Sequence, residues 1–205
     1  MHNLETPRLK LGVFHPHGSF AQALIAAALH RQYEVSALLD DLNQLNARPG
    51  LRCKLGSLDS VPTVNRAIAG LDVVLACLGT EPRDDLPPQC ACLIDGTLSL
   101  GTASKPRLFL LGHWHWLVDP DNADDEALGA GLRRSLDVSG LDWTLVEAPE
   151  LPEGLRIDDF SGSAAAESAA AQRALNCAEA VLDEVRLGLH RHECLRLRDP
   201  TEAQP

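Results

Sequence analysis

The sequence predicts an α/β fold, a doubly wound parallel sheet in a single domain. Short and dense apolar segments, such as 9–14 and 73–77, are typical of parallel strands that are buried on both faces. Longer segments with apolar residues at helical spacing alternate with these strands along the chain. The 205 residues are 45% hydrophobic and 23% charged, which is normal for a globular protein and excludes a disordered chain or a collagen-like repeat.

In the first half of the chain, strands are expected wherever the apolar runs are short, and helices wherever the apolar spacing follows one helical face. The expected order is strand 9–14, helix 20–30, strand 34–39, a weaker strand 51–55, helix 61–69 and strand 73–77. Gly70 follows the second helix, in the position where a glycine commonly ends a helix. We expect the first, second, third and fourth strands to be parallel neighbours in one sheet.

The second half repeats this alternation. Its expected order is helix 86–100, strand 107–111, helix 124–139, strand 143–147, helix 164–185 and a last edge strand at 194–197. The helix at 124–139 begins with acidic residues and carries Arg towards its end, which suits the helix dipole. The stretch 154–163 contains no clear pattern and is predicted to be a flexible loop.

The net charge of −11, with only 18 Lys and Arg, disfavours binding to nucleic acid or to an anionic membrane surface. No signal-peptide pattern follows the N-terminus, and no apolar run approaches the roughly 20 residues of a membrane span. We therefore expect a cytoplasmic protein, whose 6 Cys are thiols rather than a disulfide framework. The expected partner is a small molecule in the crevice of the sheet, and the oligomeric state is left open.

Three segments resemble the atypical short-chain dehydrogenase/reductases, in the NmrA-like, NAD(P)H-binding branch. Residues 11–24 resemble the family's opening strand, glycine loop and helix. Residues 55–59, with 70–74 and Leu78-Gly79, resemble its third strand, helix and fourth strand, and residues 140–146 resemble the segment before the substrate loop. The resemblance runs from about residue 9 to residue 149. It implies a Rossmann-like domain over residues 1–205, with a core at 1–150 and a substrate-side loop, C-terminal helix and possible edge strand at 151–205.

The glycine loop departs from the family pattern, which is close to G-x-x-G-x-x-G. Residues 15–21 read HPHGSFA, so Gly18 is kept, Ala21 is a tolerable substitute, and His15 replaces the glycine of the tight turn. We expect the His15 side chain to crowd a pyrophosphate. The helix that follows still offers free N–H groups to an anion. The resemblance then places the pyrophosphate at Gly18 and Ser19, with Leu78 and Gly79 along the cofactor; the alternative is a plain turn without a ligand.

Asp40 and Asp41 end the second predicted strand, where members that prefer NADP often carry Arg. A carboxylate there accepts a hydrogen bond from the ribose 2′-OH and repels a 2′-phosphate. If a cofactor binds, we expect Asp40 to hold the ribose and NAD(H) to be favoured over NADP(H). The alternative is a solvated acidic turn.

The Tyr–Lys proton relay of many short-chain reductases is absent, because the only Tyr is Tyr33 and Lys occurs only at 10, 54 and 105. His113 stands where relatives often have Ser, and is the candidate to orient substrate or donate a proton. The resemblance implies reduction of a small planar acceptor such as a flavin or quinone, in an activity that is weak or lost. The alternative is a non-catalytic redox sensor or interaction protein of the same family.

Two His-x-His pairs give a third hypothesis, a metal-binding protein. His15 and His17 follow the first strand, and His113 and His115 follow the fifth. If the strand order is 3-2-1-4-5, both pairs end near Cys77, which closes the fourth strand, with Glu147 nearby. Imidazole, thiolate and carboxylate are competent ligands for zinc or iron. No metal-site spacing accompanies them, so independent loop histidines are the favoured interpretation and no metal is expected.

Overall fold

The structure, a computed structural model, describes residues 8–46, 48–78, 85–112, 123–160 and 168–197. They form a 7-stranded sheet in the order β3-β2-β1-β4-β5-β6-β7, in which every neighbouring pair is parallel. The strands are β1 (Lys10–Phe14), β2 (Glu34–Leu39), β3 (Leu51–Leu55), β4 (Val73–Cys77), β5 (Arg107–Gly112), β6 (Trp143–Glu147) and β7 (Glu193–Arg196). This confirms the doubly wound α/β prediction and the edge position of the last strand.

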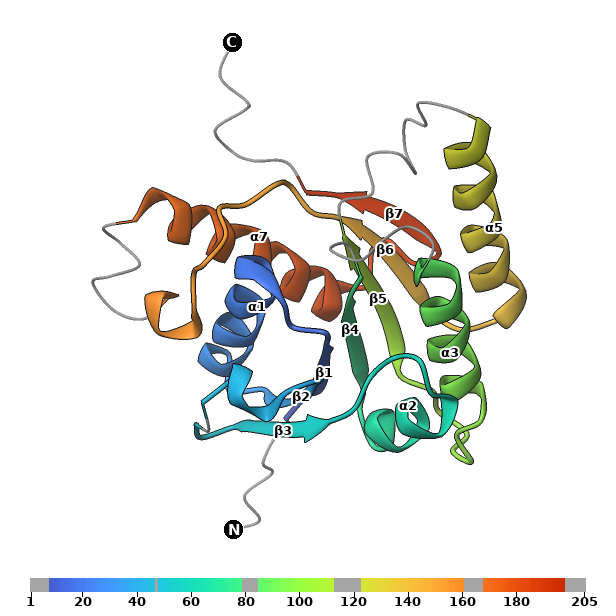
Figure 1. The fold of residues 1–205 in the computed structure, drawn as a ribbon, viewed down its shortest axis with the longest axis horizontal. Helices are drawn as coiled ribbons and strands as arrows, with labels where there is room; N and C mark the ends of the chain where they lie inside the picture. Colours follow the sequence, from blue (N-terminus) through green and yellow to red (C-terminus); the bar gives the residue numbers. More distant parts are fainter. Residues whose placement is uncertain (1–7, 47, 79–84, 113–122, 161–167, 198–205) are drawn as a thin grey trace.

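Helices cover both faces of the sheet, as a single α/β domain of this kind requires (Figure 1). One face carries α1 (Gly18–His30) and α7 (Ala169–Leu187), and the other carries α2 (Val61–Ile68), α3 (Leu86–Leu98) and α5 (Ala123–Ser139). Two short 3₁₀ helices, η1 (Leu42–Gln44) and η3 (Ile157–Phe160), lie between these elements. Among the described residues, no helix combines the length and the apolar character that crossing a membrane requires.

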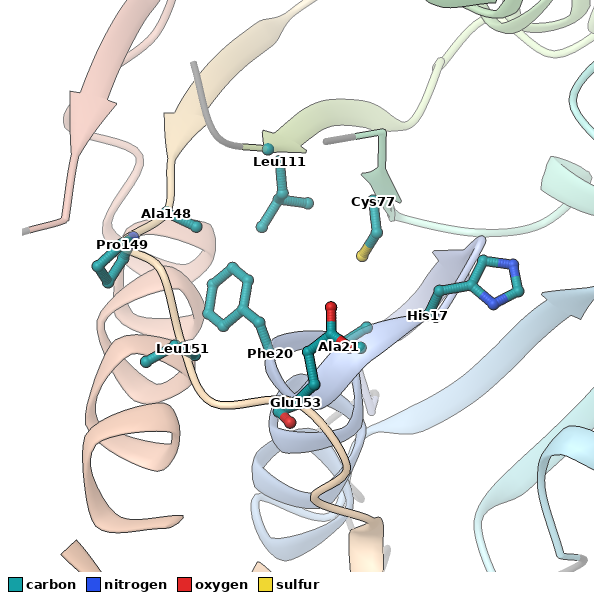
Figure 2. Close-up of a pocket in the computed structure, with 12 residues that line it drawn as sticks. His17, Phe20, Ala21, Cys77, Leu111, Ala148, Pro149, Leu151 and Glu153 are labelled. Atoms are coloured by element: carbon teal, nitrogen blue, oxygen red, sulfur yellow. The ribbon is translucent and has the colours of Figure 1, made fainter. Parts of the chain in front are cut away.

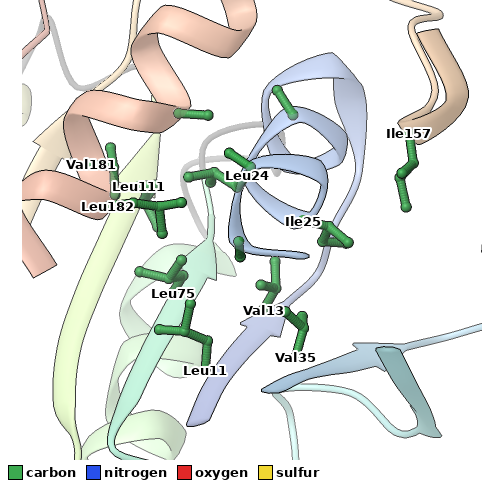
Figure 3. Close-up of a cluster of buried hydrophobic side chains, with 14 of the residues drawn as sticks. Leu11, Val13, Leu24, Ile25, Val35, Leu75, Leu111, Ile157, Val181 and Leu182 are labelled. Carbon is green, nitrogen blue, oxygen red and sulfur yellow. The ribbon is translucent and has the colours of Figure 1, made fainter. Parts of the chain in front are cut away.

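Two apolar clusters hold the layers together. Under α1 and α7, alternate strand residues such as Leu11, Val13 and Leu75 pack against Leu24 and Val181 (Figure 3). The other strand residues pack under α2, α3 and α5 in a separate cluster. Because both faces of the sheet are covered, β1, β4 and β5 need apolar residues at nearly every position, which is why these strands are recognisable as dense apolar runs.

The structure corrects two predicted boundaries. The helix predicted to begin at 164 begins at Ala169, because Ser168 has extended backbone angles and its side chain accepts a hydrogen bond from the Ala171 N–H. The predicted loop at 154–163 contains η3, whose Ile157 and Phe160 are buried against α1 and α7. Gly70, by contrast, has φ +78 directly after α2, as its predicted helix-ending position requires.

Candidate functional site

A cavity of about 80 Å³ lies at the carboxyl edge of the sheet, between the ends of the strands and the start of α1. Parallel α/β sheets bind their ligands at this edge, beside the first strand. The cavity is small next to typical ligand pockets of roughly 300–1,000 Å³. Its walls are formed by His17, Gly18, Ser19, Phe20, Ala21, Cys77, Leu111, Gly112, Ala148, Pro149, Leu151 and Glu153.

The first turn of α1 opens onto this cavity. Gly18 has φ +76, and a Cβ added there would meet nothing within 4 Å, so the backbone is accessible to a ligand. No described residue outside α1 accepts a hydrogen bond from the N–H groups of Gly18, Ser19 or Phe20. Free N–H groups and the positive end of the helix dipole favour an anion. The predicted anion-binding property of this turn therefore resides in its backbone.

The hydroxyl of Ser19 has a different task. It donates a 2.5 Å hydrogen bond to the carbonyl of Pro152 and accepts one of 3.1 Å from the Leu155 N–H. Ser19 is only 3% exposed, so both bonds are shielded from water. They fasten residues 149–155, which we call the strap, to the start of α1. The Ser19 side chain is thus engaged by the strap rather than directed at the cavity.

Side chains of the strap and of α1 also line the cavity. Figure 2 shows the Phe20 ring below Leu111 and the Glu153 side chain rising from the strap towards Cys77. Sequence reasoning missed these residues. The signal that was available for Glu153 and Leu151 is their place a few residues after the predicted strand 143–147, since ligands of parallel sheets lie beyond the carboxyl ends of strands. A carboxylate that faces the first turn of α1 disfavours a second anion at the same position.

His15 and His17 gather around Asp40. Their Nε2 atoms lie 3.8 and 3.5 Å from the two oxygens of the Asp40 carboxylate, and the two rings make an edge contact at 5.9 Å. The register that pairs Phe14 with Leu38 brings the end of β1 beside the end of β2. His15 takes the left-handed conformation, φ 51, that the family's glycine supplies.

Two expectations about these histidines are corrected. His15 is 5% exposed and is not among the cavity walls, so its side chain lies beside Asp40 rather than crowding the pyrophosphate position. Neither His15 nor His17 turns towards strands β4 and β5, where the metal hypothesis placed them: in Figure 2 His17 points away from Cys77. The physical reason is that β1 has two neighbouring strands, β2 and β4, and the turn after β1 is bonded to β2: the His15 N–H donates a 3.2 Å hydrogen bond to the Leu38 carbonyl.

The other predicted site residues have different outcomes. Leu78 is fully buried in the core under α2, α3 and α5, and its N–H donates to the Leu111 carbonyl, so its side chain faces away from the cavity. Gly79, His113 and His115 lie outside the described residues. Burial raises the pKa of Cys77 to about 12, which keeps it a neutral thiol at ordinary pH. The described part of the chain contains no group of three His, Cys, Asp or Glu side chains fit to hold a metal.

Solved structures share this fold at low sequence identity. An oxidoreductase from Lactococcus lactis has 14% identity and a TM-score of 0.69, covering 93% of this chain and 91% of its own. A candidate NADH-flavin reductase from Streptococcus pneumoniae has 18% identity and a TM-score of 0.63, with coverage of 93% and 99%. A short-chain dehydrogenase/reductase from Veillonella parvula, solved with NADP, has 14% identity and a TM-score of 0.64, with coverage of 95% and 96%. No curated protein matches the chain.

The family assignment comes from the sequence over most of its length. A family model described as NAD(P)H-binding matches residues 17–168. This span begins at the turn before α1 and includes the whole carboxyl edge of the sheet from β2 to β6. It also includes Gly18, Asp40 and the strap. The chain therefore belongs to the NAD(P)H-binding family.

Proposed function

We propose that this protein binds a nicotinamide dinucleotide at the carboxyl edge of the sheet and reduces a small planar acceptor, such as a flavin or quinone. The observation that carries the proposal is the first turn of α1: Gly18, Ser19 and Phe20 line the cavity, and their N–H groups have no acceptor among the described residues outside α1. Family membership supports the nucleotide. The name of the Streptococcus pneumoniae relative, an NADH-flavin reductase, supports the acceptor class.

The residues present fit a dinucleotide at two points. The open space beside Gly18 admits a diphosphate to the backbone N–H groups, and Asp40, which is 47% exposed at its side chain, offers an acceptor to a ribose hydroxyl. The nicotinamide ring supplies a hydride when it is bound. The chain's own part is to orient the dinucleotide along the strand ends and to close the strap over it. The small cavity requires the strap to move when the dinucleotide enters.

NAD(H) is the proposed preference over NADP(H). In the proposed pose the ribose lies beside Asp40 at the end of β2, and its carboxylate repels a 2′-phosphate. Asp41 adds negative charge nearby, although its side chain caps η1 through Asn43. The imidazoles of His15 and His17 flank the Asp40 carboxylate, with their Nε2 atoms 3.8 and 3.5 Å from its oxygens. The proton of the reduction comes from solvent or from His113, since Tyr33 follows α1 at the opposite edge of the sheet.

A second candidate is a redox sensor that binds the dinucleotide without turnover. One observation favours it: the cavity of about 80 Å³ is small for a dinucleotide together with an acceptor. In a sensor, closure of the strap on one redox form of the cofactor would be the signal. Both candidates use the same binding site and differ only in whether hydride leaves it.

Titration with NADH and NADPH, followed by turnover assays with FMN and menadione, tests the proposal. We expect saturable NADH binding and slow oxidation of NADH that depends on the acceptor. Binding without acceptor-dependent oxidation selects the sensor, and absence of binding to either dinucleotide overturns both.

A matched pair of glycine substitutions locates the site. Gly18 and Gly140 both have positive φ, and an added Cβ meets nothing within 4 Å at either position. Gly18→Asp and Gly140→Asp therefore introduce the same backbone strain and the same charge. Only Gly18→Asp places a carboxylate at the start of α1, so it alone should weaken NADH binding, by about tenfold or more. Equal effects of the two substitutions on NADH binding would show that the α1 turn is not part of the binding site.

A further inference from the structure

A second cavity, of about 430 Å³, lies at the amino edge of the sheet, where β1, β2 and β3 begin. It is on the face that carries α2. The residues around it come from the three strand starts and from the turn after α2, and they are Arg8, Lys10, Glu34, Val35, Ser36, Gly50, Leu51, Arg52, Lys54, Ala69, Gly70 and Leu71. Its volume is in the range of small-molecule pockets.

The short α2 explains why this part of the sheet is open. At the carboxyl ends of β1 and β2, Phe14 and Leu38 pack in the core with Val64 and Ile68 of α2. On the same face by strand alternation, Lys10, Ser36 and Arg52 lie towards the amino ends of the strands. Lys54 lies beside Leu38, nearer the carboxyl end of β3. Their strand neighbours Leu11, Val35 and Leu51 belong to the opposite core. The sequence therefore places polar side chains where the eight-residue α2 does not reach.

The charge around this cavity opposes that of the whole chain. Four cationic side chains, Arg8, Lys10, Arg52 and Lys54, surround a single carboxylate, Glu34, in a protein of net charge −11. Within the described residues, none of the four forms an ion pair. Asp72 lies next to the cavity and accepts a 2.9 Å hydrogen bond from the backbone N–H of Lys10, not from its ammonium.

Lys54 remains able to bind an anion although it has one partner. Its Nζ donates a 3.2 Å hydrogen bond to the Ala67 carbonyl at the end of α2, and an ammonium has three donors. That contact also offsets the negative end of the α2 dipole, which would otherwise repel an anion. The half-buried Ser36 on the floor of the cavity adds a hydroxyl that makes no hydrogen bond to a described residue.

We propose that this basic cavity is a second ligand site, for a small polyanion that carries two or more phosphate groups. Arginine forks match phosphate oxygens in pairs, and lysines add point charges. Each exposed cation contributes little by itself because water screens it, so the ligand has to engage several of them at once. A concave arrangement of cations at the start of β1 and on β3, on the two sides of β2, selects for such a multivalent ligand over a single carboxylate.

This site is independent of the proposed dinucleotide function. The cavity borders the starts of β1 to β3, and the α1 turn follows the end of β1. Five strand residues separate the two edges, about 16 Å at the usual rise of a strand. A polyanion in the basic cavity therefore does not touch the Gly18 turn, and either site can exist without the other.

Titration of the ¹⁵N-labelled protein with inorganic pyrophosphate and with tripolyphosphate, followed by amide NMR, tests the proposal. We expect saturable shifts at Ser36, Gly50 and Gly70, tighter binding of tripolyphosphate, and weakening by added salt. Shifts confined to residues 18–20 would place the anion at the α1 turn and overturn the second site. Failure to saturate below roughly 10 mM would also overturn it.

Charge-matched variants complete the test. Arg52→Gln with Lys54→Gln should lower tripolyphosphate affinity about tenfold or more. Arg134→Gln with Arg186→Gln removes the same charge from exposed positions on α5 and α7 and should change it less than about twofold. The single Arg52→Gln, at an exposed side chain, guards against a folding defect from the loss of the Lys54 contact. Equal losses in the two double variants, or binding of a single-stranded oligonucleotide but not of tripolyphosphate, would contradict the proposal.

Discussion

The amino ends of β5 and β6 and the carboxyl edge of the sheet use their polar groups in opposite ways. At the amino edge of β5 and β6, Arg107 donates to the Glu184 carboxylate at 3.0 Å and to the Thr144 hydroxyl at 2.7 Å. The guanidinium also lies 4.5 Å from the centre of the Phe109 ring. Arg107 and Glu184 are 7% and 4% exposed, and His190 donates its backbone N–H to the same carboxylate at 2.8 Å. This network ties α7 and the turn before β7 to the sheet.

At the carboxyl edge the polar groups are only partly used. Asp40 is half exposed between two imidazoles, and the N–H groups at the start of α1 have no acceptor among the described residues outside their helix. A buried network whose charged groups pair with one another stabilises the fold and offers few groups to a ligand. A partly satisfied edge is less stable and can bind one. Substitutions at the two edges should therefore differ in kind, and the largest effect is expected in the buried network.

Removing the charge of Glu184 should destabilise the protein most. Glu184→Gln leaves the buried Arg107 guanidinium with only the partly exposed Asp142 carboxylate, 3.6 Å from its Nε, as a counter-charge. We therefore expect the free energy of unfolding in urea to fall by about 3 kcal/mol. Glu179→Gln is the matched control on the same helix, because Glu179 pairs with Arg31 but is 34% exposed. It should cost about 1 kcal/mol or less. Similar losses in the two variants would show that burial does not distinguish these pairs.

The same carboxylate should make stability depend on pH. Burial raises the pKa of Glu184, but hydrogen bonds from His190 and Arg107 outweigh it and hold that pKa below its usual value. A lowered folded-state pKa gives stability that is fully present above the usual glutamate value of about 4.3 and is lost as the pH falls through the folded value. We expect the stability gap between the wild type and Glu184→Gln to narrow below about pH 4. Urea unfolding at each pH measures it, and a gap that stays constant down to about pH 2.5 would show that Glu184 is not the titrating group.

Ser19→Ala separates two roles for one hydroxyl. If Ser19 fastens the strap, the variant leaves the Leu155 N–H and the Pro152 carbonyl without partners, which lowers stability by about 1–3 kcal/mol and increases hydrogen exchange at Leu155. NADH affinity should then be unchanged or higher. If the hydroxyl instead contacts the pyrophosphate, which the sequence places at Gly18 and Ser19, NADH affinity falls while the strap stays protected. Ser135→Ala, on the exposed surface of α5, is the control and should change neither quantity.

The fold was predictable from the sequence because nearly every local signal agrees with it. The apolar runs in β1, β4 and β5 reflect burial on both faces, and Gly70 reflects a positive φ. The wrong predictions occur where tertiary contacts, rather than local sequence, determine the secondary structure. Ile157 and Phe160 stand in a polar stretch without periodicity, and only their packing against α1 and α7 makes η3. No local pattern contains that information.

The site was predictable in outline but not in its side chains. Parallel topology places the strand ends and the Gly18 turn together, so the edge could be located. The direction of His15, however, depends on which neighbour of β1 it meets, and the task of Ser19 depends on a partner 133 residues away. The burial of Leu78 depends on its alternation at the end of β4, which the pattern of a fully apolar strand cannot show.

Asp40→Arg should change the preference between cofactors at the open edge. A guanidinium at the end of β2 attracts a 2′-phosphate, so the ratio of NADPH to NADH affinity should rise about tenfold or more. Asp137→Arg makes the same charge change at an exposed position of α5 and should leave the ratio within about twofold. Fluorescence titration of both dinucleotides gives the ratio. Tighter binding of NADPH than of NADH by the wild type would show that Asp40 does not face the ribose.

Glu153→Gln tests the charge of the strap, and its expected effect on NADH affinity is the smallest of those predicted. Its carboxylate projects into the cavity on which the start of α1 opens, and a bound diphosphate is repelled by it (Figure 2). Because Glu153 is exposed, water screens most of this repulsion, so removing the charge should tighten NADH binding by about threefold to fivefold. The gain should shrink as salt is added, since screening already reduces the repulsion.

Glu150→Gln is the control for this prediction. Glu150 lies in the same strap and is exposed, but it is not one of the cavity walls, so its substitution should change NADH affinity less than about twofold. An equal gain in affinity from both variants would show that only the net charge of the protein matters. A loss of NADH affinity in Glu153→Gln would show that this carboxylate contacts the dinucleotide favourably instead of repelling it.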